Sequence, residues 1–146
     1  MSLRVQDIMI RNVVTVGAKA TVSEAIKLMV EHEIGCLVIV QNGDAIGIIT
    51  ERDVLKRVVL EAKNPKATRV SQIMTAPLVA GNPQMNIQEA VGLMTKERIK
   101  KLPVTEDGRL VGMITLTDLV RSIAYLEHIF KRMQNDMQKD ETLCFP

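Results

Sequence analysis

Two short segments combine a threonine, a carboxylate and a predicted helix start, which is a chemistry suited to binding a phosphorylated sugar. Thr50 precedes Asp53 by three residues, and Thr115 precedes Asp118 by the same spacing. A threonine hydroxyl and the free N–H groups of a helix start can donate to phosphate, while a carboxylate can accept from two sugar hydroxyls. The same spacing is that of a capping box, which only closes a helix start. The two roles are partly compatible, and both remain open.

Basic side chains near these segments could neutralise phosphate charge. Arg52 offers two parallel donors, and Lys100 and Lys101 are adjacent in the chain. Together with Lys96 and Arg98, the lysines would equally suit a solvated helix end near the negative pole of the helix dipole. The spacing alone does not decide between a ligand site and a solvated surface.

Composition excludes several other classes of function. A net charge of +2 is too small for a concentrated nucleic-acid footprint, and 2% aromatic residues offer no base-stacking platform. The longest purely aliphatic run, Leu37 to Val40, is too short to span a bilayer. We therefore expect no nucleic-acid partner and no membrane segment, and we expect a cytoplasmic protein.

Catalytic and metal-binding patterns are not evident. His32 and His128 are far apart and have no nucleophile or second ligand nearby in the sequence. Cys36 lies in an apolar run and is expected to be a small buried hydrophobe, while Cys144 lies in the tail. We expect no enzyme, no metal site and no required cofactor.

The chain is duplicated internally at a spacing of 65 residues, since Val5 aligns with Val70 and 70 − 5 = 65. The register runs without gaps and includes turn glycines and helix-start carboxylates. Matched pairs are Glu24 with Glu89, Met29 with Met94, Gly43 with Gly108, Gly47 with Gly112, and Asp53 with Asp118. We divide the chain into repeat 1 (1–63), a linker (64–69), repeat 2 (70–122) and a C-terminal helical extension and tail (123–146).

The sequence pattern of each repeat predicts the same helices, strands and turns. An extended stretch, Val13 to Val16 in repeat 1, precedes a helix opened by the capping box of Thr21 and Glu24, which Asn86 and Glu89 reproduce. Asn42-Gly43 and Asp107-Gly108 predict hairpins, and a further helix begins near Thr50 or Thr115. The buried helical faces are expected to hold Val22, Ala25, Ile26, Met29 and Val30, and then Ile87, Ala90, Val91 and Met94.

This pattern closely resembles the CBS domain, a β-α-β-β-α unit that usually occurs as a tandem pair called a Bateman module. The carriers are the entry segments 5–9 (VQDIM) and 70–74 (VSQIM), together with the exit segments 47–53 (GIITERD) and 112–118 (GMITLTD). The resemblance implies an α/β (α+β) fold in which two repeats pack about a pseudo-twofold axis. It also implies two clefts that commonly hold AMP, ADP, ATP or S-adenosylmethionine.

Carrying the family pattern over residue by residue gives two expected sites. The first joins Met9, Asn12, Val14, Ile34, Gly35 and Cys36 with Lys100, Lys101, Thr115, Thr117 and Asp118. The second joins Met74, Pro77, Val79, Ile99, Lys100 and Lys101 with Gly35, Thr50, Arg52 and Asp53. The two aspartates would bind the ribose. Because Gly35-Cys36 stands where repeat 2 has Lys100-Lys101, the clefts should differ, and we expect the first to bind polyphosphate better.

The last predicted helix extends beyond the end of repeat 2. Its apolar residues step by 4, 3, 4, 3 and 4, at Leu119, Ile123, Leu126, Phe130, Met133 and Met137. This heptad-type seam predicts packing against another chain along roughly 30 Å at 1.5 Å per residue. The alternative is that the helix folds back on its own module.

Together these features predict a regulatory module that binds an adenine nucleotide or a related adenosyl ligand, forms a homodimer and signals to an unidentified effector protein. The competing prediction is a ligand-independent oligomerisation or protein-interaction module that acts through the C-terminal helix.

Overall fold

The computed structural model describes residues 3–143, with side chains described as far as residue 139, so Cys144 lies outside the described residues. Repeat 1 contains α1 (Val5–Ile8), β1 (Thr15–Gly17), α2 (Val22–His32), β2 (Cys36–Gln41), β3 (Asp44–Thr50) and α3 (Glu51–Val54), which continues as a π-helical turn, Leu55–Val59. Repeat 2 contains α4 (Val70–Ile73), α5 (Ile87–Glu97), β4 (Lys101–Glu106), β5 (Arg109–Thr115) and α6 (Leu116–Leu143). Within the described part of the chain, no helix is long and apolar enough to cross a membrane.

The predicted turns and helix starts are confirmed. Asn42 and Gly43 have φ of 54° and 83°, and Asp107 and Gly108 have 51° and 81°. These left-handed pairs form the tight turns whose twist matches that of the flanking antiparallel strands. Capping boxes open both long inner helices, as the sequence predicted.

The two sheets differ, which the repeat did not predict. Repeat 1 has a three-stranded sheet in the order β1-β2-β3, whereas the sheet of repeat 2 has only β4 and β5. The counterpart of β1 is reduced to a single bridge between Gly81 and Val104. Pro103 occupies the position of Val38 and has no N–H to donate, so the ladder cannot continue along β4 as it does along β2.

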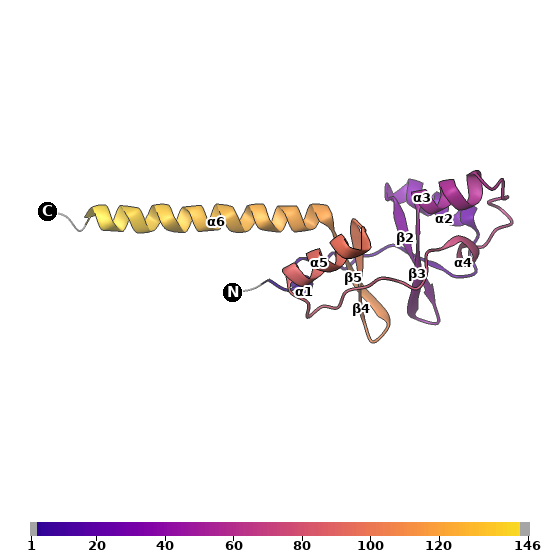
Figure 1. Ribbon diagram of the computed structural model, residues 1–146, viewed down its shortest axis with the longest axis horizontal. Helices are drawn as coiled ribbons and strands as arrows, with labels where there is room; N and C mark the ends of the chain where they lie inside the picture. Colours follow the sequence, from indigo (N-terminus) through magenta and orange to yellow (C-terminus); the bar gives the residue numbers. More distant parts are fainter. Residues whose placement is uncertain (1–2, 144–146) are drawn as a thin grey trace.

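The two entry helices, α1 and α4, are exchanged between the repeats (Figure 1). Ile10 pairs with Met113 of β5, and Thr75 pairs with Ile48 of β3. Accordingly, Val5 of α1 is fully buried in the core of repeat 2, and α4 is buried in the core of repeat 1. Neither core is complete without a segment from the other repeat, which fixes the relative placement of the two halves.

Two equivalent glycines make room for this exchange. A Cβ at Gly112 would lie 2.6 Å from Sδ of Met9 and 3.0 Å from the carbonyl oxygen of Ile10. A Cβ at Gly47 would meet Met74 and Thr75 in the same way, at 2.7 and 3.0 Å. The methionine of each entry segment therefore lies directly over a glycine of the opposite hairpin.

Replacing Gly112 by alanine is expected to lower the free energy of unfolding by about 1–3 kcal/mol, because the added methyl group must displace both Met9 and a backbone carbonyl. Gly92 is the matched control, since a Cβ there meets nothing within 4 Å and the residue lies inside α5. Gly92→Ala should raise the stability by up to about 1 kcal/mol through helix propensity. Urea denaturation measures both, and a stabilising Gly112→Ala would contradict the close approach.

Helix α6 places Leu119, in its first turn, in the core of repeat 2 and then extends away from the module (Figure 1). The seam residues beyond Leu119 are exposed, with exposed fractions of 47% at Leu126 and 63% at Phe130. The alternative in which the helix folds back on its own module is therefore wrong. Nothing in the described chain covers the outer seam.

Candidate functional site

The larger of the two cavities between the repeats has a volume of about 660 Å³ and corresponds to the second expected site. Every residue expected there lines it except Met74, which instead lies over Gly47. The lining residues brought together as expected are Gly35, Thr50, Arg52, Asp53, Pro77, Val79, Ile99, Lys100 and Lys101. Cys36, which was expected in the first site, lines this cavity as well, and sequence reasoning missed Ile48, Lys56, Arg57, Thr75, Arg98 and Pro103, which complete the wall.

Asp53 is the buried carboxylate of this cavity, at 8% exposure. Its Oδ2 accepts hydrogen bonds from the backbone N–H of Thr50 at 3.0 Å and from the Thr50 hydroxyl at 3.1 Å. Its Oδ1 accepts from the hydroxyl of Thr75 at 3.1 Å. A carboxylate has about four acceptor sites, so about one remains for a ligand. The capping-box role is thus real, and it coexists with a place in the cavity wall.

The cavity that holds this carboxylate is also lined by several cations. Arg57 lies with its Nε 4.0 Å from Oδ1 of Asp53, and its Nη1 donates to the carbonyls of Ile73 and Met74. Arg52, Lys56, Arg98, Lys100 and Lys101 also line the cavity. All of these except half-buried Lys101 are solvent-exposed and can reorient toward a ligand. A cavity with this excess of cations attracts anions.

The smaller cavity, of about 210 Å³, corresponds to the first expected site but brings together only part of it. Asn12, Val14, Ile34, Cys36, Lys101 and Thr115 line it, along with Ile10, Val13 and Met113. The expected residues Met9, Gly35, Lys100, Thr117 and Asp118 do not line it. Since Lys100 lines the larger cavity instead, the structure does not support the premise that the first cleft is the more basic one.

Asp118 differs from its counterpart Asp53 in its free acceptor capacity. Its Oδ2 accepts from the Thr115 N–H at 3.1 Å and from the Thr115 hydroxyl at 2.7 Å. Ile10 stands where repeat 2 supplies Thr75, and among the described residues no donor reaches Oδ1 of Asp118. The difference between the two aspartates follows from one substitution in the entry segments.

Cys36 and Lys101 occupy equivalent positions, since 36 + 65 = 101, and both line both cavities. Burial raises the pKa of the Cys36 thiol, and the nearby Lys101 ammonium opposes that effect. The thiol is therefore neutral near pH 7, in keeping with the expected role as a small buried hydrophobe. The wall between the cavities thus pairs one apolar side chain with one cation.

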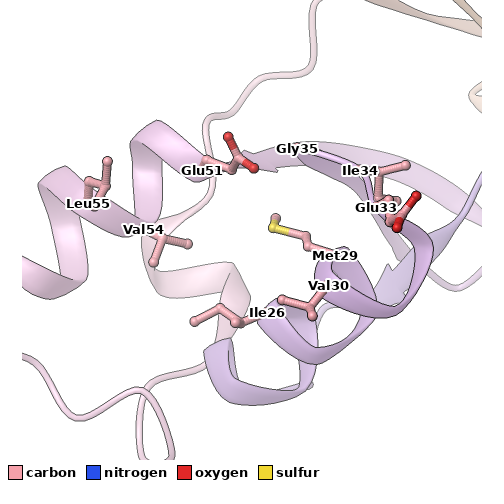
Figure 2. Close-up of a pocket in the computed structure, with 9 residues that line it drawn as sticks. All are labelled: Ile26, Met29, Val30, Glu33, Ile34, Gly35, Glu51, Val54 and Leu55. Atoms are coloured by element: carbon pink, nitrogen blue, oxygen red, sulfur yellow. The ribbon is translucent and has the colours of Figure 1, made fainter.

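A third depression lies on the outside of repeat 1, and the sequence did not predict it. Figure 2 shows this groove of about 570 Å³ between α2 and α3. Its lining is apolar apart from the carboxylates of Glu33 and Glu51. Val30, which the helical periodicity placed on the buried face, is 72% exposed here. The sequence did hold a signal for this exposure, because Val30 lies at the margin of the apolar stripe of its helix.

Comparison with known proteins gives consistent matches. A family model described as "CBS domain" matches residues 5–60 and 70–125. The CBS domain-containing protein YhcV of Bacillus subtilis is 36% identical over 115 residues, covering 79% of this chain and 81% of that protein. The mitochondrial CBS domain-containing protein CBSX3 of Arabidopsis thaliana is 38% identical over 113 residues, covering 74% of this chain but 54% of that protein. A hexameric CBS-CP12 protein from bloom-forming cyanobacteria aligns with a TM-score of 0.75 and 31% identity, covering 99% of this chain and 88% of its own.

Proposed function

Because the chain belongs to the CBS domain family and carries two repeats, we propose that it is a regulatory module that binds an adenine nucleotide in its larger cavity. The observation that carries this proposal is the lining of that cavity, which holds several cations from both repeats together with the carboxylate of Asp53. Its volume of about 660 Å³ lies within the range of small-molecule sites, about 300–1,000 Å³. The smaller cavity falls below that range.

The parts of a nucleotide find matching chemistry in different parts of the wall. Ile48, Val79 and Ile99 supply apolar surface for adenine, and Asp53 supplies an acceptor for a ribose hydroxyl. Phosphate oxygens would meet the cations, of which arginine can bind through two donors. This charge favours AMP, ADP or ATP over S-adenosylmethionine, because the sulfonium and ammonium groups of the latter outweigh its carboxylate.

Occupancy can affect the whole module because both repeats form the cavity. Repeat 1 contributes Thr50, Arg52 and Asp53, and repeat 2 contributes Ile99 to Lys101. A ligand that bridges them favours whichever relative placement of the repeats gives the tighter contacts. The proposal includes a homodimer and an effector protein that reads the altered geometry. The hexameric relative supports self-association. It also places the protein in the cytoplasm, where a free buried Cys36 stays reduced.

Isothermal titration calorimetry with AMP, ATP and S-adenosylmethionine tests the proposal. Both nucleotides should bind more tightly than S-adenosylmethionine, and the difference should shrink as salt is raised, since screening weakens the attraction between exposed charges. Absence of heat and of any thermal shift at millimolar concentrations of all three compounds would contradict a sensor function.

A second candidate function is a ligand-independent interaction module acting through α6. The exposed seam at Ile123, Leu126, Phe130, Met133 and Met137 favours it, because an isolated amphipathic helix gains most of its stability from packing. This function predicts that Phe130→Glu combined with Met133→Glu abolishes assembly while nucleotides have no effect. Retained assembly in that variant would exclude it.

A further inference from the structure

Thr75 lines the larger cavity and makes a side-chain bond that has no counterpart in repeat 2. Its hydroxyl donates to Oδ1 of Asp53 at 3.1 Å, whereas the equivalent residue of repeat 2 is Ile10, because 10 + 65 = 75. Thr75 pairs with Ile48 through two backbone hydrogen bonds, of 2.8 and 3.1 Å. Ile10 pairs with Met113 in the same way, at 2.9 Å in both directions. The fold therefore accepts an aliphatic β-branched side chain at this position, and the pairing of the segment does not need the hydroxyl.

The Thr75 hydroxyl takes one of the last two acceptor sites on Asp53. A carboxylate has about four such sites, two on each oxygen. Thr50 fills both sites of Oδ2, through its backbone N–H and its hydroxyl. Nε of Arg57 lies 4.0 Å from Oδ1, which is beyond hydrogen-bond distance. Oδ1 therefore has one site occupied by Thr75 and one site that a ligand can use.

We propose that Thr75 limits Asp53 to one of the two ribose hydroxyls, and so sets how strongly the larger cavity distinguishes ribonucleotides from deoxyribonucleotides. One sugar hydroxyl can donate to the free site on Oδ1. The second can reach this oxygen only by displacing the Thr75 hydroxyl, which exchanges one hydroxyl–carboxylate bond for another of the same kind and gains almost nothing. Thr75 is thus a positioning residue, because it acts on the ligand through Asp53.

This inference rests on the proposed nucleotide binding and assigns the sugar selectivity of that site. It predicts the opposite of what removing a polar cavity residue ordinarily does. In Thr75→Val the second sugar hydroxyl gains a bond on Oδ1, so the affinity for AMP should rise about 3- to 10-fold. The substitution keeps a β-branched side chain and leaves the backbone bonds to Ile48 in place, as Ile10 does in repeat 2.

Isothermal titration calorimetry with AMP, 2′-deoxy-AMP and 3′-deoxy-AMP tests the inference. The two analogues together cover either hydroxyl as the one that Asp53 accepts. At least one of them should bind the original chain within about twofold of AMP, because it keeps the one hydroxyl that is bound. The same analogue should show no gain in Thr75→Val, since a single hydroxyl needs only the site that is already free.

Two further variants separate the hydroxyl from the shape of the side chain. Thr75→Ser keeps the hydroxyl and should keep the original ratio of AMP affinity to deoxynucleotide affinity. Thr117→Val makes the same exchange of a hydroxyl for a methyl group at an exposed residue that lines neither cavity. All three of its affinities should stay within about twofold of the original, and circular dichroism checks that each variant is folded.

A loss of AMP affinity in Thr75→Val, or an equal change for all three nucleotides, would overturn the inference, because Thr75 would then contact the ligand itself or serve the fold alone. It would also be overturned if both deoxynucleotides bound the original chain at least about tenfold more weakly than AMP, since Asp53 would then accept both hydroxyls. An original chain that binds no AMP would refute the proposed function, and this inference with it.

Discussion

Replacing Ile73 by alanine should destabilise the core of repeat 1, although Ile73 belongs to repeat 2 by sequence. Its side chain is fully buried among residues of repeat 1, including Leu37 and Ile49. Removing a buried isoleucine to leave alanine costs about 2–5 kcal/mol, because the surrounding side chains close the cavity only in part. That loss is a large share of the free energy of unfolding of a whole domain, which is about 5–15 kcal/mol. Urea unfolding should therefore show it clearly.

Hydrogen exchange shows which core responds. In Ile73→Ala the amides of β2 and β3 should lose protection before those of β4 and β5. Ile8→Ala is the matched control, since 8 + 65 = 73 and Ile8 packs against the core of repeat 2. Its effect should be the mirror image, with protection lost first in β4 and β5. If Ile73→Ala loosened only repeat 2, the exchange of entry helices would be wrong.

The exchange could not be read from the sequence, because a duplicated pattern is the same whichever core the entry segment joins. Val5 and Val70 both carry the apolar signal of a buried helix, and local periodicity does not identify the partner. What the sequence does determine is local. The turns at Asn42-Gly43 and Asp107-Gly108 and the capping boxes at Thr21 and Asn86 follow from backbone and side-chain chemistry within a few residues.

The candidate site was predictable to the extent that it follows the duplication. The expected second site came together except for Met74, whose role over Gly47 depends on the exchanged packing. Lys100 was expected in both clefts, but it precedes the first residue of β4 and lines only the larger cavity. Lys101, its neighbour, lines both.

Asp53→Ala should lower the affinity for AMP by about 10- to 150-fold, which corresponds to the roughly 1.5–3 kcal/mol of one charge-assisted hydrogen bond. One bond is the appropriate estimate because Thr50 and Thr75 already occupy the other acceptor sites of this carboxylate. A ribose would bind through both hydroxyls only by displacing the Thr75 hydroxyl. Calorimetry with AMP measures the loss directly.

Asp53→Ala also removes part of a helix cap, so a lower affinity for AMP could result from a disturbed helix start. Asp118→Ala resolves this, because Asp118 makes the same two bonds to Thr115 but does not line the larger cavity. Both variants should lose the cap, at a cost of the order of 1 kcal/mol, and Asp53→Ala should lose the bond from Thr75 in addition. Only Asp53→Ala should lose AMP affinity, and Asp118→Ala should stay within about threefold of the original, well under 1.4 kcal/mol. Equal losses in both would mean that the aspartates serve the fold alone, and the ribose would then have to be bound by other groups.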